Sequence, residues 1–429
     1  MDHPTPSMET WAERARAVLP GGGFGNFDPS VVIREGRGSR VWDEDGREYV
    51  DYLIGSGPMI LGHGHPEVLD AVRDQLPHGM TFFANNARGI ELAEVICEAM
   101  PAAERLRYVS TGGEADMYAM RLARAFTGRA KILKFEGGYH GMSAEALMSL
   151  APKHLVNFPQ PLPDTAGLTE SVSAEVLVAP FNDLAFAQSL IAEHGHEIAG
   201  VIVEPLQRLI PPAPGFLEGL RSACTGAGIL LIFDEVVTGF RLAYGGAQEI
   251  YGVKPDLCTL GKIIGGGMPL AAIAGRADIM ELFDKAAGER FLYQVGTLSG
   301  NPVAAAAGLK TLEILRRPGA YETIRGHGER LMASAKGALD RAGIAHDIVG
   351  DPVLFDVVFN PLKVRDYRGV FAADRRKSET WNRALRASGI FKSEGKIYPH
   401  LALTEADLTQ TEAAFERAAQ AVAGLPERA

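Results

Sequence analysis

Between about residues 85 and 310, short apolar runs alternate with stretches of helical periodicity, and this alternation constrains the fold more than any other feature. The expected strands are 106–109, 131–135, 176–179, 200–203, 229–233 and 271–274, and the expected helices between them are 114–127, 183–194 and 215–226. Strands that are apolar throughout and interleaved with amphipathic helices predict an α/β fold with a mostly parallel, doubly wound sheet. Glycine-rich loops follow several strands, and open sheets of this kind bind ligands there.

The two ends of the chain have a different pattern. Residues 41–53 predict a hairpin with Asp45-Gly46 as its turn. After about residue 315 the pattern predicts helices at 320–343, 378–388 and 405–423, with short strands near 346–358. We therefore expect a second, smaller α/β domain built from both termini. The expected division is an N-terminal segment, 1–60, that joins a small C-terminal domain, 316–429, around a large ligand-binding domain, 61–315. The Pro-rich stretch 153–174 is too long for a plain connection and is expected to lie over another part of the protein.

Composition excludes several classes of protein. Of 429 residues, 46% are hydrophobic and 22% are charged, which is typical of a globular chain rather than a disordered one. The formal net charge of −10 disfavours nucleic acid as a partner, because such binding needs a basic surface. No uninterrupted apolar run approaches the ~18 residues of a membrane span. The three cysteines lie far apart and the N-terminus is polar, so we expect a cytoplasmic protein without disulfides.

Two residues near the predicted strand ends are candidates for covalent chemistry. The strand 229–233 delivers Asp234 to the ligand-binding edge of the sheet, where a carboxylate could hold a cation. Lys262 lies between a strand-like apolar run and Ile263-Ile264 followed by three glycines. Burial in such surroundings lowers the pKa of a lysine, and the neutral amine is the form that reacts with carbonyl groups. The glycines follow Lys262 rather than precede it, so this is not a P-loop.

Three further loops offer weaker signals. Thr111-Gly112-Gly113 opens a helix, where backbone amides and the helix dipole favour a phosphate, provided that the acids Glu114 and Asp116 point away. Tyr139 follows a Gly-Gly turn and could stack on a flat ligand. Thr297, in the loop YQVGTLSGNP, could also hold a phosphate. Each motif alone also fits ordinary turn or helix-start chemistry.

The combination points to one cofactor. A lysine that can form an imine, an acid at a strand end, a phosphate-type loop and a stacking aromatic are the groups that pyridoxal 5'-phosphate requires. The sequence thus predicts an enzyme that uses this cofactor.

The chain resembles the class III, fold-type I pyridoxal-phosphate aminotransferases, and within them the glutamate-1-semialdehyde 2,1-aminomutase group. The resemblance extends over about residues 15–420 and is carried by RLARAFTGRAKILKFEGGYHG, FDEVVTGFR, YGVKPDLCTLGKIIGGGMP and GTLSGNP. It implies a homodimer whose two active sites are shared across the interface.

The resemblance also implies a role for each candidate residue. The Schiff-base lysine is Lys262, and Asp234 is the partner of the pyridinium nitrogen. The remaining cofactor-binding residues are Val236 and Tyr139 on the two ring faces, Glu204 at a strand end, Thr111, Gly112 and Gly113 in the phosphate loop, and Thr297 donated by the partner subunit. No metal site is expected, and the pairs His63-Gly-His65 and His194-Gly-His196 lack the acid or cysteine that would complete one.

The sequence departs from the aminomutase pattern around the substrate. Asp28 stands where an arginine normally binds the substrate carboxylate, and Gly395, next to Glu394, stands where a glutamate is expected. The phosphate loop reads Thr-Gly-Gly in place of Ser-Gly-Thr, and the segment after Glu204 is shorter. We therefore expect a ping-pong aminotransferase that moves an amino group from an amino acid or amine to a separate keto or aldehyde acceptor. The alternatives are an aminomutase that acts within one molecule and, with less support, a racemase.

Overall fold

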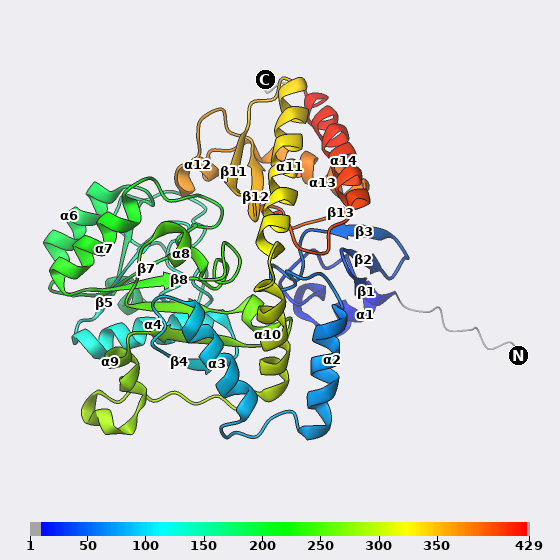
Figure 1. Cartoon of the computed structure of the whole chain (residues 1–429). Helices are drawn as coiled ribbons and strands as arrows, with labels where there is room; N and C mark the ends of the chain where they lie inside the picture. The colour runs from blue at the N-terminus through cyan, green and yellow to red at the C-terminus, as the bar shows by residue number, and fades with distance from the viewer. Residues whose placement is uncertain (1–9, 427–429) are drawn as a thin grey trace, which may run out of the picture.

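A seven-stranded sheet forms the core of the larger part of the protein in the computed structural model, which describes residues 10–426 (Figure 1). Its strand order is β4-β10-β9-β8-β7-β5-β6. The strands are β4 (Arg105–Val109), β5 (Lys131–Phe135), β6 (Val176–Ala179), β7 (Ile198–Val203), β8 (Leu230–Asp234), β9 (Leu257–Leu260) and β10 (Ala271–Gly275). β10 runs antiparallel to both of its neighbours, and the other pairings are parallel. The mostly parallel sheet predicted from the sequence is thus confirmed.

Both faces of this sheet are buried, as a doubly wound sheet requires. The side chains of β8 alternate between two hydrophobic clusters: Leu231 and Phe233 belong to one, and Leu230 and Ile232 to the other. Successive side chains of a strand point to opposite faces, so the two clusters are the two covers of the sheet. The covering helices are α4 (Gly112–Thr127), α6 (Leu184–His194), α7 (Phe216–Ala227), α8 (Gly246–Tyr251) and α9 (Ala277–Met280).

A smaller unit joins residues from both ends of the described chain. β1 (Ile33–Arg37), β2 (Arg40–Asp43) and β3 (Glu48–Asp51) form an antiparallel sheet, and β13 (Ile390–Phe391) adds to β3 in parallel. The hairpin of β11 (Asp347–Asp351) and β12 (Leu354–Val358) and the helices α11 (Ala320–Arg341), α13 (Arg375–Ala387) and α14 (Glu405–Ala423) complete it. Trp381 of α13 stacks on Phe415 of α14, with ring centroids 5.5 Å apart, in a separate hydrophobic cluster. The fold class is therefore α/β with a small unit built from both termini, whereas the numerical domain boundaries stay a prediction, and their outermost residues lie outside 10–426.

Three of the remaining helices pack together. α10 (Pro302–Leu315) packs against α2 (Pro66–Gln75) and α3 (Ala87–Ala99). The others are α1 (Trp11–Val18), α5 (Glu170–Ala174), α12 (Tyr367–Phe371) and 3₁₀ turns at Pro20–Gly22, Leu76–His78, Lys262–Gly265, Glu281–Phe283 and Lys285–Arg290. Within residues 10–426, none of the helices combines the length and apolar character that crossing a membrane requires.

The long Pro-rich stretch, 153–174, contacts the small unit. Arg368 of α12 donates to the carbonyl of Val156 over 2.8 Å, and its guanidinium lies 4.0 Å from the centre of the Phe158 ring. Tyr367 donates from its hydroxyl to the carbonyl of Pro152, just before the stretch. These contacts agree with the expectation that the loop lies over another part of the protein.

Candidate active site

The carboxyl ends of five strands that point the same way bring the predicted site residues to one edge of the large sheet. β8 ends with Asp234, β7 is followed by Glu204, and β9 is followed by Gly261 and Lys262. β5 leads to Tyr139, and β4 leads to Thr111 at the start of α4. This edge is where open parallel sheets place their ligands.

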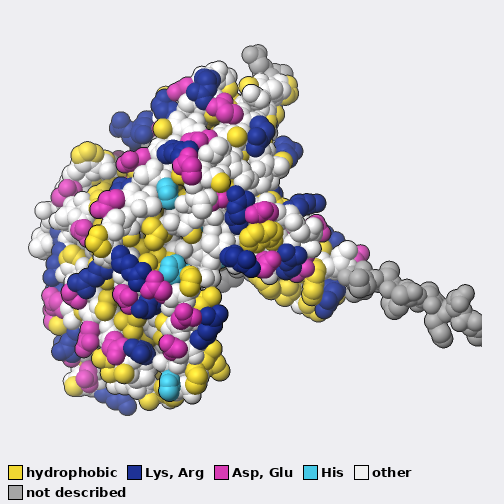
Figure 2. Space-filling view, turned by 45° about the vertical axis from the view of Figure 1, so that its right-hand side comes forward, with side chains coloured by type: hydrophobic (Ala, Val, Ile, Leu, Met, Phe, Trp, Pro, Cys, Tyr) yellow, Lys and Arg dark blue, Asp and Glu magenta, His cyan; other side chains and the backbone are white. Residues whose placement is uncertain are grey.

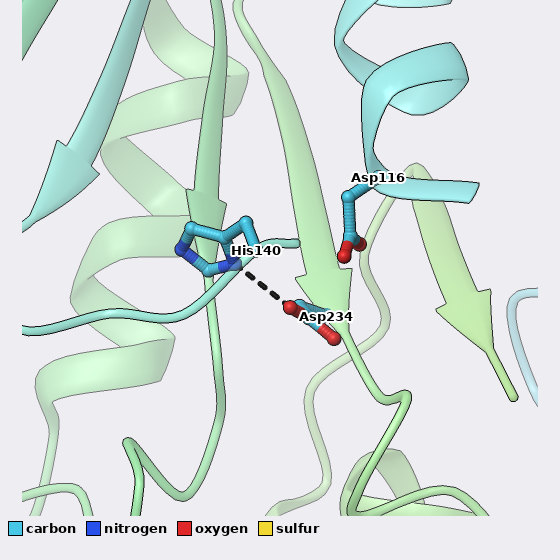
Figure 3. Close-up of side chains that lie close together, drawn as sticks. All are labelled: Asp116, His140 and Asp234. Atoms are coloured by element: carbon cyan, nitrogen blue, oxygen red, sulfur yellow. Dashed lines mark hydrogen bonds and ion pairs between the residues drawn. The ribbon is translucent and has the colours of Figure 1, made fainter. Parts of the chain in front are cut away.

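Asp234 is buried and its carboxylate is held in one orientation. Its Oδ2 faces Nδ1 of His140 (Figure 3), at a distance of 2.8 Å, and its Oδ1 accepts from the backbone amide of Val236 over 3.1 Å. His140 is 1% exposed, and its Nε2 has no hydrogen-bond partner within the described residues. His140 therefore fixes the orientation of the Asp234 carboxylate through its Oδ2. The sequence analysis did not assign this role to His140, although the residue follows Tyr139 directly.

A second buried acid, Asp116 of α4, lies beside Asp234. The Thr259 hydroxyl donates to Asp116 Oδ1 over 2.6 Å and is 3.5 Å from Asp234 Oδ1. Burial, and next the charge of Asp234, raise the pKa of Asp116 well above its ordinary value. The sequence indicated only that Asp116 must point away from a phosphate. The structure adds that it points into the sheet toward Asp234, as seen in Figure 3.

Glu235, next to Asp234, faces the opposite way. Its Oε2 accepts from the Thr238 hydroxyl over 3.0 Å and from the Ala247 amide over 2.6 Å. Burial raises the pKa of Glu235 to about 7. Of the two consecutive acids, Asp234 is thus the one aimed at the site, and Glu235 ties β8 to α8.

Lys262 is held in a strained and largely desolvated position. Its φ is 50°, in the left-handed region that most side chains avoid. A Cβ on Gly57 would lie 3.5 Å from Lys262 Cδ and 3.1 Å from the Tyr398 ring, so the lysine stem and the tyrosine ring both border Gly57. Burial lowers the pKa of Lys262, the charge of Lys396 lowers it further, and Tyr398, Asp234 and Glu204 act in the opposite direction. The lowered pKa shifts Lys262 toward the neutral amine, which is the form that carbonyl chemistry needs.

The start of α4 leaves two backbone amides free for an anion. Glu114 accepts from the amides of Ser110 and Thr111 over 2.8 and 3.0 Å, and the Thr111 hydroxyl in turn accepts from the Glu114 amide. The amides of Gly112 and Gly113 precede the first intrahelical hydrogen bond and have no helical acceptor. Glu114 is therefore turned back to its own helix start, which agrees with the expectation that it points away from a phosphate.

Close approaches explain why these positions are glycines. A Cβ on Gly112 would lie 2.6 Å from Val236 Cγ1, and one on Gly113 would lie 3.1 Å from Gly141 Cα. Val236 also lies 3.2 Å from where a Cβ on Gly261 would be. Val236 thus borders the predicted phosphate loop, the residue before Lys262 and, through its amide, Asp234. The place predicted for it, under one face of a ring, is compatible with these contacts.

Tyr139 and Glu204 are joined to one another. Glu204 is 4% exposed, and its Oε2 accepts from the Tyr139 backbone amide over 2.9 Å. Tyr139 is 39% exposed, so it is not enclosed by its own chain and can still contact a flat ligand. The guanidinium of Arg208, which sequence reasoning did not consider, lies 5.3 Å from the centre of that ring.

Thr297 stands apart from these residues. It lies on an exposed loop, where its carbonyl accepts from the Thr81 hydroxyl over 3.3 Å. No hydrogen bond within residues 10–426 joins it to Lys262, Asp234 or α4. Its predicted role as a ligand donated to a partner subunit stays a prediction.

The residues at the departures from the aminomutase pattern also have definite places. Asp28 forms an ion pair with Arg386 over 2.8 Å and accepts from the Ser30 amide and hydroxyl. Glu394 and Gly395 are exposed at the tip of a turn. Asp28 is thus engaged with a cation of its own chain.

Asp116, His140 and Asp234 place donor atoms within 4.8 Å of one another, a spacing that could hold a metal ion. Asp234 Oδ2 and His140 Nδ1, however, face each other over 2.8 Å. Two ligands of one ion point at the ion rather than at each other, so we assign this group to the orientation of Asp234.

The geometry fits pyridoxal phosphate on each of its functional groups. Free amides at a helix start suit the phosphate, an oriented buried carboxylate suits the ring nitrogen, and a desolvated lysine suits the aldehyde. A half-exposed tyrosine and an apolar valine remain for the two faces of the ring.

Comparisons with known proteins agree with this reading. The family model described as "Aminotransferase class-III" matches residues 25–417. The chain is 46% identical over 367 residues to a glutamate-1-semialdehyde 2,1-aminomutase of Neisseria meningitidis serogroup A, covering 83% of this chain and 84% of the relative. Its structure superposes on an omega-transaminase from Sphaerobacter thermophilus with a TM-score of 0.91 and 34% identity, covering 96% and 97% of the two chains. A transaminase with pyridoxal phosphate bound matches with a TM-score of 0.88 and 31% identity, covering 96% of each chain.

The protein belongs to the class-III aminotransferase family. It is a pyridoxal-phosphate-dependent enzyme of fold type I that acts on the amino groups of small-molecule substrates.

Proposed function

We propose that the enzyme transfers an amino group between two separate molecules, an amine or amino acid donor and a keto or aldehyde acceptor, with Lys262 and Asp234 as its catalytic residues. The observation that carries the intermolecular reaction is the Asp28–Arg386 ion pair. The resemblance places a substrate-binding arginine of the aminomutase at position 28, and here an acid that already has a cationic partner stands there. The structural similarity to transaminases supports the same reading.

Bound pyridoxal phosphate supplies an electrophilic carbon for the amine and a ring that accepts the electrons of the substrate's Cα–H bond. Lys262 provides the amine that holds the cofactor and then carries the proton to and from the substrate Cα as general base and acid. Its lowered pKa keeps a larger fraction of the amine neutral near pH 7, which is the form that accepts a proton. Asp234 keeps a proton on the ring nitrogen, because a buried opposite charge favours the charged form of its partner.

The other predicted residues bind and orient. Gly112 and Gly113 offer their amides to the phosphate, together with Thr111. Tyr139 and Val236 confine the ring between them, and Glu204 fixes the Tyr139 backbone. None of these residues needs to move a proton in this mechanism.

An aminomutase is the second candidate, and the 46% identity to a curated glutamate-1-semialdehyde 2,1-aminomutase favours it. One experiment separates the two. Purified enzyme is given a panel of amine donors with a separate keto acid, and transfer of ¹⁵N from donor to acceptor is followed by mass spectrometry. Transfer between the two molecules supports the proposal. Isomerisation of glutamate-1-semialdehyde without any acceptor, and no transfer in the panel, contradicts it.

The active enzyme is, in this proposal, a homodimer that shares its sites. Several large apolar side chains are exposed on the segments around α3 and the loop of Thr297, an arrangement that favours burial against a partner. They are Met80, Phe82, Phe83, Ile90, Tyr293, Val295 and Leu298. Light scattering after gel filtration measures the mass that this predicts.

The proposed location is the cytoplasm. All three cysteines are free, and two of them, Cys224 and Cys258, are buried, as is common where disulfides are rare. On the face shown in Figure 2, acidic and basic side chains are interspersed rather than gathered into one basic patch. Small molecules are therefore the partners we propose besides a second subunit.

A further inference from the structure

We propose that Lys396 and Arg208 form a binding site for a carboxylate of the substrate, so that the enzyme prefers amino and keto acids over amines without a carboxylate. This inference rests on the proposed aminotransferase function and adds the substrate class. It names two cations that the sequence comparison with the family did not assign.

Lys396 is a half-buried cation beside the reacting lysine. It lies one residue past the turn Glu394-Gly395, with its Nζ 6.0 Å from the centre of the Tyr398 ring. The same ring is the one that the Lys262 stem approaches at Gly57. Lys396 is close enough to Lys262 for its charge to lower the pKa of that amine.

Arg208 lies next to the predicted ring-stacking residue Tyr139, close enough to Lys396 for the two positive charges to repel one another. It occupies the first central position of a tight turn closed by two hydrogen bonds between Gln207 and Ile210, of 3.0 and 2.8 Å. Its φ is 60°, and glycine is the residue that usually takes such a position. A non-glycine residue held in this conformation costs free energy, and such strain concentrates at functional sites.

Neither cation has an anionic partner within residues 10–426. Lys392, four residues before Lys396, pairs with Asp356 over 2.8 Å and donates to Asn382, so it is satisfied inside the small unit. The two nearby acids are also engaged, Glu204 with the Tyr139 amide and Asp234 with His140. Lys396 and Arg208 are thus left without an anionic partner beside Tyr398 and Tyr139, close to the predicted cofactor-binding residues.

The charges around Lys396 make an anion the natural occupant. Burial, and next the charge of Arg208, lower the pKa of Lys396 to about 7; the charge of Arg241 acts in the same direction, and those of Glu204 and Asp234 act in the opposite one. Arg241 is fully buried and donates to the carbonyls of Gly57, Val353 and Pro399, so it is not free to bind substrate. A carboxylate placed between Lys396 and Arg208 would relieve their repulsion and favour the charged lysine.

The test compares donors in matched pairs, each an amino acid and the amine that lacks its carboxylate, such as 3-amino-3-phenylpropanoate with 1-phenylethylamine and 4-aminobutanoate with propylamine. In Lys396→Met, KM for the acids should rise about 30-fold, as expected for loss of a charged hydrogen bond, while KM for the amines changes less than about 3-fold. Lys396→Arg should restore most of the affinity, and Arg208→Met should raise KM for the acids about 10-fold. Lys285→Met, on the exposed segment after α9, is the control lysine.

Binding of succinate to the enzyme loaded with cofactor, measured by calorimetry, gives a readout independent of turnover. Succinate should bind more weakly above pH 7, where Lys396 loses its proton, and this pH dependence should vanish in Lys396→Met. Lys396 could instead bind the phosphate of the cofactor, and titration of the cofactor-free enzyme with pyridoxal phosphate tests this alternative. A loss of cofactor affinity in Lys396→Met, with unchanged KM for the acids, overturns the proposal.

The two levels of inference fail in different ways. If amino transfer proceeds equally well with acids and amines, and succinate does not bind, the carboxylate site is wrong and the aminotransferase stands. If succinate binds in a Lys396-dependent way but no donor in the panel transfers its amino group, the carboxylate site stands and the proposed reaction is wrong.

Discussion

Asp116 and Asp234 are two buried carboxyl groups that approach one another from different elements, α4 and β8, on either side of the Thr259 hydroxyl. The hydroxyl has one proton, and at 2.6 Å it serves Asp116 rather than Asp234, which is 3.5 Å away. The negative charge of Asp234 is therefore neutralised less than it would be if the Thr259 hydroxyl donated to it. A carboxylate in this condition binds the ring proton of the cofactor more strongly.

Replacement of Asp116 by Asn is expected to stabilise the protein above about pH 4. The folded protein raises the pKa of Asp116, so it binds this proton more tightly than the unfolded chain does. Below the pKa that Asp116 has in the unfolded chain, both the folded and the unfolded states are protonated. As pH rises above that pKa, the unfolded state loses the proton first, and the free energy of unfolding falls. Asp116→Asn removes that loss of stability and should raise the melting temperature by roughly 2 °C at pH 8.

The gain from Asp116→Asn should shrink toward zero as pH falls to 4, which thermal unfolding at a series of pH values measures. Asp70→Asn, at an exposed position of α2, is the control and should show no such trend. A gain that is the same at every pH would mean that the effect is one of packing and not of the Asp116 proton.

Asp234→Asn is expected to lower kcat on the order of 100-fold, because an amide cannot keep the ring nitrogen charged. Glu235→Gln is a closely matched control, since it changes the neighbouring buried acid that faces α8. The two variants are compared by their kcat with the best donor of the panel and by the absorbance spectrum of the bound cofactor. Equal losses in both would refute the assignment of Asp234 to the cofactor.

Lys262→Ala is expected to abolish turnover, leaving less than about 0.1% of kcat, because the covalent attachment and the proton carrier are both removed. Borohydride treatment of the wild type should fix the cofactor to a peptide that contains Lys262, which mass spectrometry identifies. The same treatment of Lys262→Ala should leave no adduct at that peptide. An adduct on Lys396 in the wild type would assign the covalent role to the other lysine of the site.

The elements that the sequence predicted best are those determined by local pattern. The runs 131–135 and 176–179 coincide with β5 and β6, and the helix at 405–423 coincides with α14, because apolar periodicity alone specifies them. The direction of β10 is different, since an antiparallel strand in an otherwise parallel sheet depends on pairing with β4 and β9. No feature of residues 271–275 by themselves reveals it.

The local sequence likewise reveals some residues of the candidate site and not others. Asp234 and Lys262 follow apolar strands and are visible as motifs, whereas Asp116 resembles an ordinary acid in the first turns of a helix. Its relation to Asp234 depends on the register that pairs Asp234 with Thr259 across β8 and β9. Arg208 and Lys396 are similar cases, because each lies on a short turn whose position is set by distant parts of the fold.

Thr297 provides a test of the shared active site that single variants cannot give. If Thr297 serves the site of the partner subunit, each active site combines Lys262 of one subunit with Thr297 of the other. Lys262→Ala then inactivates the site of its own subunit. Thr297→Asp inactivates the site of the partner subunit, because a carboxylate repels the cofactor's phosphate. In a mixed dimer, one of the two sites then combines an intact Lys262 with an intact Thr297.

Mixing the two inactive variants after partial unfolding and refolding should therefore restore activity, to about one quarter of the wild-type value when half of the dimers are mixed and one of their two sites is intact. Differently tagged subunits allow the mixed dimer to be isolated and its mass measured by light scattering. Refolding of each variant alone is the control and should restore nothing. An inactive mixed dimer of the correct mass would show that Thr297 acts within its own subunit.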